Sequence, residues 1–499
     1  MPHDRAMHWP PWRVGLAAAL PLLVAYLSTT SPELTWSHHN EDGGDLVTAA
    51  YRMGIPHPTG YPWYLLTCKI WMTLFPFGTI AWRAHVYAIL AGLAACIILG
   101  IVVRRMTREL IPEAPCAVDV FLQIAATWML GASFPVWSQS IIAEVYAPNL
   151  AFIAVLLWCV AWYLTSVDAH EQGRAFCWFA AIQGLALTNH LTSAYATIGA
   201  AATLLWSLGA PSLKVWMRAI LVAIAPLSLY LLLMIYSLRQ PPLDWSNPET
   251  LHNLRMHATA AQFRFMLLGE FPAQAWWRLF LEMDWIDDYG YVLSIIAIIG
   301  ATASLIRATP AGRAFLVAVL TIWGFNCWHI ANYAVSDYEA FLVPASAMLG
   351  ICVALGLVQI ALGTDQWWSA KTLETDAGPR RRLQALLAVA TLVPSVALAV
   401  RTYPAALIPL PTDPQLMAAD AKAVLPDGAL LLEVFYGRGF AWWYFRETDP
   451  YWNQHQIDLV YIEPLHDTWG QLLLKRNDPS VVFTQEPTVR EELIVENLV

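Results

Sequence analysis

Three carboxylates and a histidine lie close together in one short stretch of an otherwise apolar chain. Glu41, Asp42 and Asp45 stand in "EDGGD", and His57 opens "HPTGYP". Glycine has no Cβ atom, so "DGGD" lets the backbone turn sharply between two carboxylates, while the two prolines restrict the chain that follows. A rigidly held carboxylate suits a general base that deprotonates a hydroxyl group. The alternative is a hydrated loop at the membrane edge, whose acidic side chains serve only to solvate the loop.

Further polar side chains recur between the apolar segments. Glu144 and Tyr146 occur in "AEVYAPN", Asn189 and His190 in "TNHLT", and Asp337 in "SDYEAF". Taken alone, a histidine at the end of a helix, such as His190, is more often an interfacial residue than a catalytic one. Asp337 begins a predicted helix, where a negative charge is favourable without any active site. Their value as site residues therefore depends on whether they share one face of the membrane.

A long polar segment adds basic side chains. Arg255, His257 and Arg264 follow one another there, and arginine offers paired donors to the oxygens of a phosphate group. These three are our candidates for holding a phosphate. The alternative is that they only form ion pairs with the nearby Asp244 and Glu249.

The composition indicates a polytopic membrane protein. Of the 499 residues, 58% are hydrophobic and 13% are charged, whereas an ordinary soluble domain has roughly 25% charged residues. The net charge is −9 and no basic run indicates a nucleic-acid partner. The seven cysteines form no CxxC pair, so we expect neither a disulfide framework nor a zinc site.

Eleven apolar segments approach the roughly 20 residues that a membrane-spanning helix needs. We interpret the first as a retained helix, because no small-residue cleavage site follows it. The predicted spans are 12–30, 83–103, 118–135, 148–165, 175–189, 192–208, 217–237, 291–306, 314–330, 340–362 and 383–400.

The distribution of charge predicts the orientation of these spans. With a cytoplasmic N-terminus, the short inner segments carry most of the Lys and Arg that precede the C-terminal tail, as the positive-inside rule requires. All the polar stretches described above then fall on outer segments, together with most of the 37 Asp and Glu. Polar chemistry is thus predicted on one face of the membrane, and the short loops suggest a bacterial inner membrane.

The composition changes after the last predicted span. Residues 401–499 contain a predicted helix, a turn at Pro426–Gly428, a buried strand at Ala429–Phe435, a second helix and two further strands in "IDLVYIEP" and "SVVFTQE". No GxGxxG is present. We therefore predict two domains: an all-α transmembrane bundle over residues 1–400 and a small extracytoplasmic α/β domain over residues 401–499.

Five blocks of the chain resemble one known family. "EDGGDLVTAAYRMGIPHPTGYPWYLL", "FPVWSQSIIAEVYAPN", "GLALTNHLT", "LDWSNPETLHNLRMHATAAQF" and "SDYEAFLVPA" occur in the family's order across roughly residues 36–346. They are similar to the domain-of-unknown-function 2723 family of GT-C-type membrane glycosyltransferases, which includes protein O-mannosyltransferases. Asp45 stands where relatives more often have Glu, and Thr59 stands where the family commonly has a second proline.

The resemblance implies a GT-C fold and an inverting transfer of a sugar, with mannose as one candidate. The implied partners are a polyprenyl-phosphate sugar donor, the lipid bilayer, and an exported protein or a glycan as hydroxyl acceptor. By position in the family, Asp42 and Asp45 are the implied catalytic acids, and His57, Glu144, Tyr146, Asn189, His190 and Asp337 fall in the matching blocks as substrate-binding candidates. We expect no cofactor, although a divalent metal ion near Asp42, Asp45 and Glu144 stays an alternative.

Two other classes of function remain open. A transporter or flippase of polyprenyl-linked sugars would place polar residues along its spans, and the predicted spans are nearly free of charge. A non-catalytic scaffold that only presents the C-terminal domain would leave the five polar blocks without a purpose. Convergence of Asp42, Glu144, His190 and Asp337 on one cavity would favour the enzyme.

Overall fold

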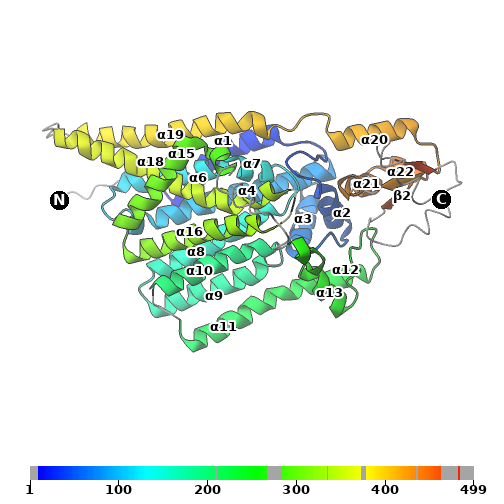
Figure 1. Cartoon of the computed structure of the whole chain (residues 1–499), viewed down its shortest axis with the longest axis horizontal. Helices are drawn as coiled ribbons and strands as arrows, with labels where there is room; N and C mark the ends of the chain where they lie inside the picture. The colour runs from blue at the N-terminus through cyan, green and yellow to red at the C-terminus, as the bar shows by residue number, and fades with distance from the viewer. Residues whose placement is uncertain are drawn as a thin grey trace.

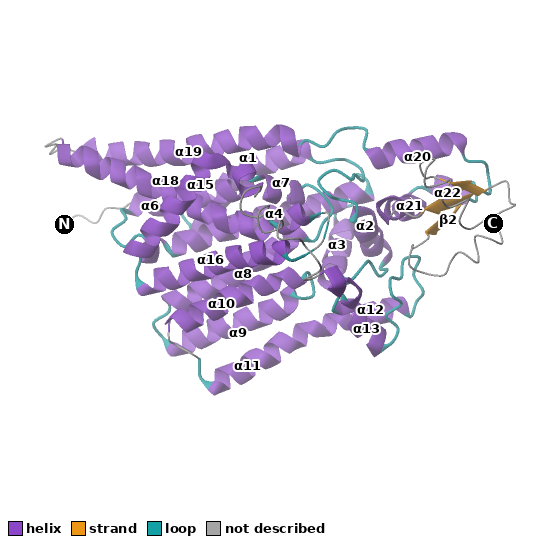
Figure 2. Ribbon diagram, in the orientation of Figure 1, coloured by secondary structure: helices purple, strands orange, loops and turns teal. Residues whose placement is uncertain are grey.

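Most of the chain folds into long helices that run side by side (Figures 1 and 2). The computed structural model describes residues 9–207, 211–266, 284–333, 335, 337–371, 378–433, 436–461 and 481–483. The first helices are α1 (Pro11–Thr29), α2 (Gly43–Arg52), α3 (Pro62–Leu74), α4 (Ile80–Arg105), α5 (Thr107–Leu110), α6 (Cys116–Gly131), α7 (Phe134–Ser140), α8 (Tyr146–Thr165), α9 (Ala169–Ala186), η1 (Leu191–Ser193) and α10 (Ala194–Ser207). They are followed by α11 (Leu213–Ile224), η2 (Ala225–Tyr230), α12 (Leu231–Ser237), α13 (Leu251–Ala258), η3 (Ala261–Met266), α15 (Asp284–Arg307), α16 (Pro310–Ala331), α17 (Tyr338–Phe341), α18 (Val343–Lys371) and α19 (Gly378–Ala406).

Within the described residues, eight helices are long and apolar enough to cross a membrane. The bent pair α6 and α7, which meet at 67°, would make a ninth span. The predicted spans at 175–189 and 192–208 are helical, as α9 and α10, but do not reach the same length and apolarity. The reason is local: α9 begins with the polar sequence "AHEQGR" and α10 has only 14 residues.

The helical bundle separates the connecting segments predicted to be outer from those predicted to be inner. α2, α3, α13 and the C-terminal elements lie at one end, on the right in Figure 1, whereas the last residues of α18 and the first residues of α19 lie at the other. The polar stretches that the sequence placed on one face of the membrane accordingly share one end of the bundle. We call this end the polar end.

The two glycines that follow Asp42 serve helix packing. They do not form the predicted sharp turn, because Gly43 and Gly44 begin α2. A Cβ atom on Gly44 would lie 2.5 Å from the main-chain carbonyl of Phe440, and one on Gly43 would lie 2.4 Å from the Asn40 side chain. The absence of side chains therefore lets α2 approach a helix from the far end of the sequence.

That partner helix belongs to the C-terminal elements. These are α20 (Asp413–Val424), β1 (Leu430–Glu433), α21 (Tyr436–Thr448), α22 (Pro450–Gln454), β2 (Asp458–Tyr461) and β3 (Val481–Phe483). The strands form a parallel sheet in the order β2-β1-β3 and lie within the predicted strand segments. Residues 462–480 and 484–499 of the predicted domain lie outside the described part of the chain, and its boundary at residue 401 stays a prediction. α19 continues to Ala406.

Replacing Gly44 with alanine tests the packing of α2 against α21. The added methyl group would overlap main-chain atoms, so we expect a loss of about 1–3 kcal/mol of stability, measured as a lower midpoint of thermal unfolding in detergent. Gly363→Ala in α18 is the matched control, because no atom lies within 4 Å of the added Cβ position. Equal midpoints for the two variants would contradict this account of the close contact.

Candidate active site

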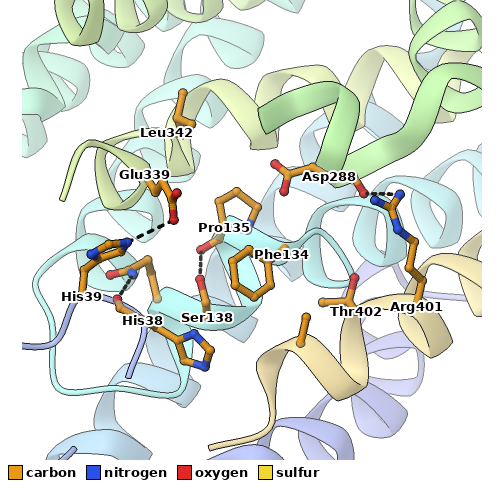
Figure 3. A pocket seen from close by; sticks show the side chains of 12 residues that line it. His38, His39, Phe134, Pro135, Ser138, Asp288, Glu339, Leu342, Arg401 and Thr402 are labelled. Carbon is orange, nitrogen blue, oxygen red and sulfur yellow. Dashed lines mark hydrogen bonds and ion pairs between the residues drawn. The ribbon is translucent and has the colours of Figure 1, made fainter. Parts of the chain in front are cut away.

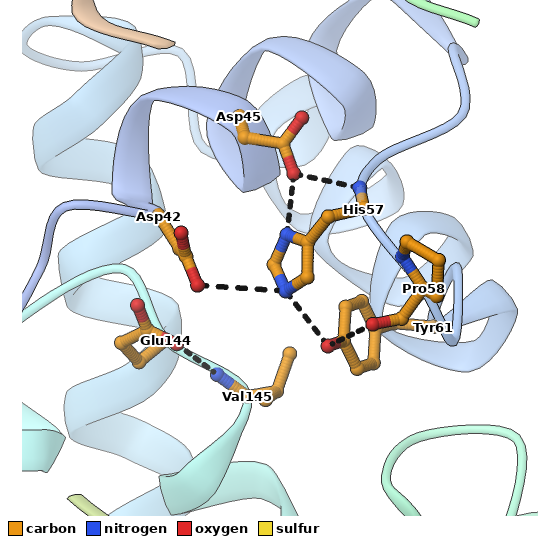
Figure 4. Close-up of polar contacts among 7 residues, drawn as sticks. All are labelled: Asp42, Asp45, His57, Pro58, Tyr61, Glu144 and Val145. Carbon is orange, nitrogen blue, oxygen red and sulfur yellow. Dashed lines mark hydrogen bonds and ion pairs between the residues drawn. The ribbon is translucent and has the colours of Figure 1, made fainter. Parts of the chain in front are cut away.

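His57 is the centre of the polar cluster (Figure 4). Its Nδ1 atom lies 2.6 Å from Asp45 Oδ2, and its backbone N–H donates to the same oxygen over 2.9 Å. Asp45 is in the first turn of α2 and its side chain is 0% exposed. The contact therefore fastens the "HPTGYP" loop to α2 and fixes the plane of the imidazole ring.

The hydrogen bonds also determine the protonation of the ring. Tyr61 donates its hydroxyl hydrogen to the carbonyl oxygen of Pro58 (3.0 Å), so it accepts from His57 Nε2 at 2.8 Å. Nδ1 faces a carboxylate and must also carry a hydrogen. Burial by itself would lower the pKa of His57, but the charges of Asp42 and Asp45 outweigh it and raise this pKa to about 9. His57 is thus an imidazolium at neutral pH.

Asp42 faces the other side of this cation. Its Oδ2 atom lies 3.5 Å from His57 Nε2, and its side chain stays 33% exposed. Surrounding protein atoms raise the pKa of Asp42 to about 6, and the nearby acids Asp337 and Asp45 add to this rise, whereas His57 opposes it. A general base should be accessible to its substrate, ionised at neutral pH, and have a pKa close to neutral pH. The carboxylate of Asp42 meets these three conditions.

Two other acids are close enough for their charges to act on this group. Glu144 is buried just before α8, and burial together with the charge of Asp42 raises its pKa well above the ordinary value. Burial also raises the pKa of Asp337. Asp337 directly precedes the four-residue helix α17, and its side chain makes no cap hydrogen bond to that helix. The cluster therefore favours a protonated Glu144 beside an ionised Asp42.

His190 forms an aromatic wall with its neighbours. Its ring stacks parallel to Tyr61, with centroids 6.0 Å apart, and lies 5.3 Å from the ring of Tyr146. Burial lowers the pKa of His190 to about 3, and Nδ1 accepts from the backbone N–H of Thr192. The ring is neutral with its hydrogen on Nε2, so this atom can only donate a hydrogen bond.

The remaining predicted residues have different surroundings. Asn189 is buried and donates to the carbonyl oxygen of Val145, which positions the segment between Glu144 and Tyr146. His257 is buried against Gly60, whose lack of a Cβ atom permits the close approach, and burial lowers the pKa of this histidine to about 3.

Arg255 and Arg264 are exposed at the polar end, on α13 and η3. Among the described residues, no ion pair joins them to Asp244 or Glu249; Asp244 instead accepts from Ser237 Oγ.

The structure therefore brings Asp42, Asp45, His57, Glu144 and Asp337 together, with His190 and Tyr146 beside them. Sequence reasoning missed Tyr61, although it stands within the quoted "HPTGYP". It also missed His39 and Glu339, whose side chains pair at 3.1 Å. In the described part of the chain, no group of three or more His, Cys, Asp or Glu is arranged to hold a metal ion. Metal independence stays a prediction.

Comparisons with known proteins agree with the sequence blocks. Residues 42–212 match the family described as "Protein O-mannosyl-transferase TMEM260 N-terminal domain". This segment is similar to that domain. It begins at Asp42 and includes every predicted site residue except Arg255, His257, Arg264 and Asp337.

The curated relatives are larger proteins. The chain is 30% identical to the protein O-mannosyl-transferase TMEM260 of Mus musculus over 183 residues, which is 36% of this chain and 25% of the mouse protein. It is 24% identical to the protein of the same name from Dictyostelium discoideum over 280 residues, 52% of this chain and 33% of that protein. The chain thus spans about a quarter to a third of the length of these relatives.

Solved structures confirm the predicted GT-C-like membrane bundle. The apo crystal structure of ArnT from Cupriavidus metallidurans superposes with a TM-score of 0.59 at 12% identity, covering 97% of this chain and 94% of ArnT. The apo oligosaccharyltransferase of Archaeoglobus fulgidus gives a TM-score of 0.51 at 12% identity, covering 89% of this chain and 64% of that one. Residues 42–212, which match that family model, are therefore part of a helical membrane protein with this fold.

Replacing Asp45 with asparagine tests the origin of the charge on His57. Without the carboxylate, we expect the pKa of His57 to fall by at least one unit from about 9, measured by NMR of selectively labelled histidine. Because this folded-state pKa lies above the ordinary 6.5, the contribution of the pair to stability is full below pH 6.5 and is lost as the pH rises through about 9. Asp427→Asn, which removes the partner of His455, is the control. An unchanged His57 titration in the Asp45 variant would contradict the assignment.

Proposed function

We propose that this protein is a GT-C-type glycosyltransferase that moves a sugar from a polyprenyl-phosphate donor to a hydroxyl group. The observation that carries the proposal is the position of Asp42. Its carboxylate is partly exposed at the polar end of a membrane bundle, 3.5 Å from a histidine whose other side is held by Asp45. This arrangement presents a general base where an acceptor from water and a donor from the bilayer can meet.

The reaction is a single displacement with inversion. Asp42 takes the proton of the acceptor hydroxyl group while the oxygen of that hydroxyl group forms a bond to the anomeric carbon of the sugar. The bond from that carbon to the phosphate oxygen breaks, and polyprenyl phosphate leaves with the electron pair. Since phosphate is a good leaving group, no second catalytic acid is needed, unlike the paired acids of glycosidases.

The other acids and histidines then have supporting roles. Asp45 is fully buried, so we assign it a positioning role through His57 instead of contact with substrate. The Nε2–H of His190 is suited to donate to the donor phosphate or to a sugar hydroxyl. Arg255 and Arg264 are exposed at the same end and are the candidates for neutralising the leaving phosphate.

The nature of the substrates is supported by the relatives. A second ArnT structure that shares the fold, with a TM-score of 0.56, is bound to undecaprenyl phosphate, which supports a polyprenyl-phosphate donor. The names of the curated relatives support mannose as the sugar and a protein hydroxyl as the acceptor. The positive-inside pattern supports an extracytoplasmic position for the polar end, and the short loops suggest a bacterial inner membrane.

Replacing Asp42 with asparagine tests the base directly. With polyprenyl-phosphate mannose and a pool of serine- and threonine-containing peptides, we expect transfer to fall by about 10²- to 10⁴-fold with an unchanged unfolding midpoint. Glu41→Gln is the neighbouring control and keeps transfer. Full activity in the Asp42 variant would contradict the proposal for this residue.

The pH dependence of the wild-type enzyme tests the same assignment independently. Asp42 must be deprotonated to act as a base, so we expect transfer to fall as the pH drops through about 6. Loss of the His57 cation should lower transfer again as the pH rises through about 9. A transfer rate that stays constant between pH 5 and pH 7 would rule out Asp42 as the group whose protonation lowers transfer at acidic pH.

A further inference from the structure

The single hydrogen on Nε2 of His57 has two acceptors beside it (Figure 4). The hydroxyl oxygen of Tyr61 lies 2.8 Å from Nε2, and Asp42 Oδ2 lies 3.5 Å from it. Donor and acceptor atoms of an N–H···O hydrogen bond are roughly 2.7–3.2 Å apart, so the hydrogen bond goes to Tyr61. Asp42 is therefore attracted by the His57 cation without accepting a hydrogen bond from it.

The neighbours of Tyr61 hold its hydroxyl group in this position. The ring of Tyr61 stacks parallel to the ring of His190, and its hydroxyl donates to the carbonyl oxygen of Pro58 over 3.0 Å. Burial and the nearby carboxylates raise the pKa of Tyr61 well above its ordinary value, so the hydroxyl keeps its hydrogen. Because that hydrogen is given to Pro58, only the lone pairs of the oxygen face His57.

The side chain of Asp42 is held less firmly than that of Tyr61. It makes no cap hydrogen bond to α2 and stays 33% exposed. Its separation from His57 Nε2 exceeds an ordinary hydrogen bond by only a few tenths of an ångström, so a small movement of the carboxylate would close the gap. A hydrogen bond to the ionised carboxylate would stabilise the charged form and lower the pKa of Asp42, which would make it a weaker base.

The charge of Asp42 depends strongly on His57, because the other groups that interact with it are acids and tyrosines. The acids are Glu41, Asp45, Glu144 and Asp337. The tyrosines are Tyr61, Tyr146 and Tyr333. His39 is three residues before Asp42, but its Nε2 atom pairs with Glu339 Oε2 at 3.1 Å (Figure 3). Whether His57 donates its Nε2 hydrogen to Asp42 or to Tyr61 therefore matters for the basicity of Asp42.

We propose that Tyr61 is a positioning residue for the transfer reaction: it takes up the Nε2 hydrogen of His57 and so leaves the Asp42 carboxylate open to the acceptor hydroxyl group. The inference rests on the proposed function and deepens it. Tyr61 acts through His57 and does not itself touch the reacting atoms. The His57 cation still attracts the carboxylate and holds it in place, but the lone pairs of Asp42 stay available for the proton of the acceptor.

Replacing Tyr61 with phenylalanine tests the inference, because it removes the acceptor and keeps the ring that stacks on His190. We expect the freed hydrogen to bond to Asp42 and to lower the pKa of Asp42 by about 1–2 units, the effect of one hydrogen bond to a charged group. NMR of the full chain in nanodiscs, with isotope-labelled aspartate, follows the carboxyl carbon of Asp42, whose signal is assigned by its loss in Asp42→Asn. The loss of transfer at acidic pH should move to lower pH by the same amount. Transfer above pH 7 should fall about threefold to tenfold, since the base is weaker.

Tyr87→Phe is the matched control. It also removes a tyrosine hydroxyl group from a hydrogen bond, here the 2.7 Å contact with Thr67 that joins α4 to α3. We expect this variant to keep the wild-type pKa of Asp42 and the wild-type pH profile. A ring-fluorinated tyrosine at position 61 is the second variant: it keeps the shape of the side chain and weakens its oxygen as an acceptor. It should lower the pKa of Asp42 by a smaller amount than Tyr61→Phe, so the test does not depend on the folding of one variant.

The contrary outcomes are distinct. If the wild type transfers sugar and both Tyr61 variants keep or raise the pKa of Asp42, the inference is wrong and the proposed function stands. A fall in transfer with an unchanged pH profile would show that Tyr61 only supports the fold, which also overturns the inference. If the wild type transfers no sugar from any polyprenyl-linked donor, the proposed function fails, and the catalytic role of Tyr61 fails with it even where NMR shows the shift of Asp42.

Discussion

The buried contact between Asp45 and His57 is the interaction on which the rest of the polar cluster depends. One carboxylate oxygen accepts from both the backbone and the ring of His57, so α2 and the "HPTGYP" loop cannot move independently. Breaking a buried pair by removing one partner costs about 3–5 kcal/mol. The fixed ring then presents Nε2 to Asp42 and Tyr61, and the close packing of Gly44 against Phe440 holds α2 itself in place.

This constraint gives chemically similar acids different states. Asp42 and Glu144 act on each other electrostatically, and like charges at short range disfavour simultaneous ionisation. Asp42 is the one beside the accessible nitrogen of the His57 cation and keeps a low enough pKa to be charged at neutral pH. Glu144 is buried without such a partner and favours its protonated form, in which it can donate a hydrogen bond. A base and a donor thus arise from the same type of side chain through their surroundings.

The sequence predicted the features that depend on local composition. Apolar runs predicted the long helices, and charge asymmetry predicted that Asp42, Glu144, His190 and Asp337 would share one end of the bundle. Features that depend on distant contacts were not predictable. Gly44 packs against a helix that lies almost 400 residues later in the chain. The ion pair of His39 and Glu339 likewise joins residues that are far apart in the sequence. Asp45 differs from Asp42 in burial and in its hydrogen bonds to His57, which the spacing "DGGD" does not reveal.

The most direct test of the account is an experimental structure of the protein in a nanodisc with an unreactive polyprenyl-phosphate mannose analogue and a serine peptide. The account predicts that the serine hydroxyl lies within hydrogen-bond distance of Asp42, about 2.6–3.2 Å, with the phosphate at the polar end and Asp45 still bound to His57. A donor head group at the opposite end of the bundle, or a serine hydroxyl held by another acid, would contradict it.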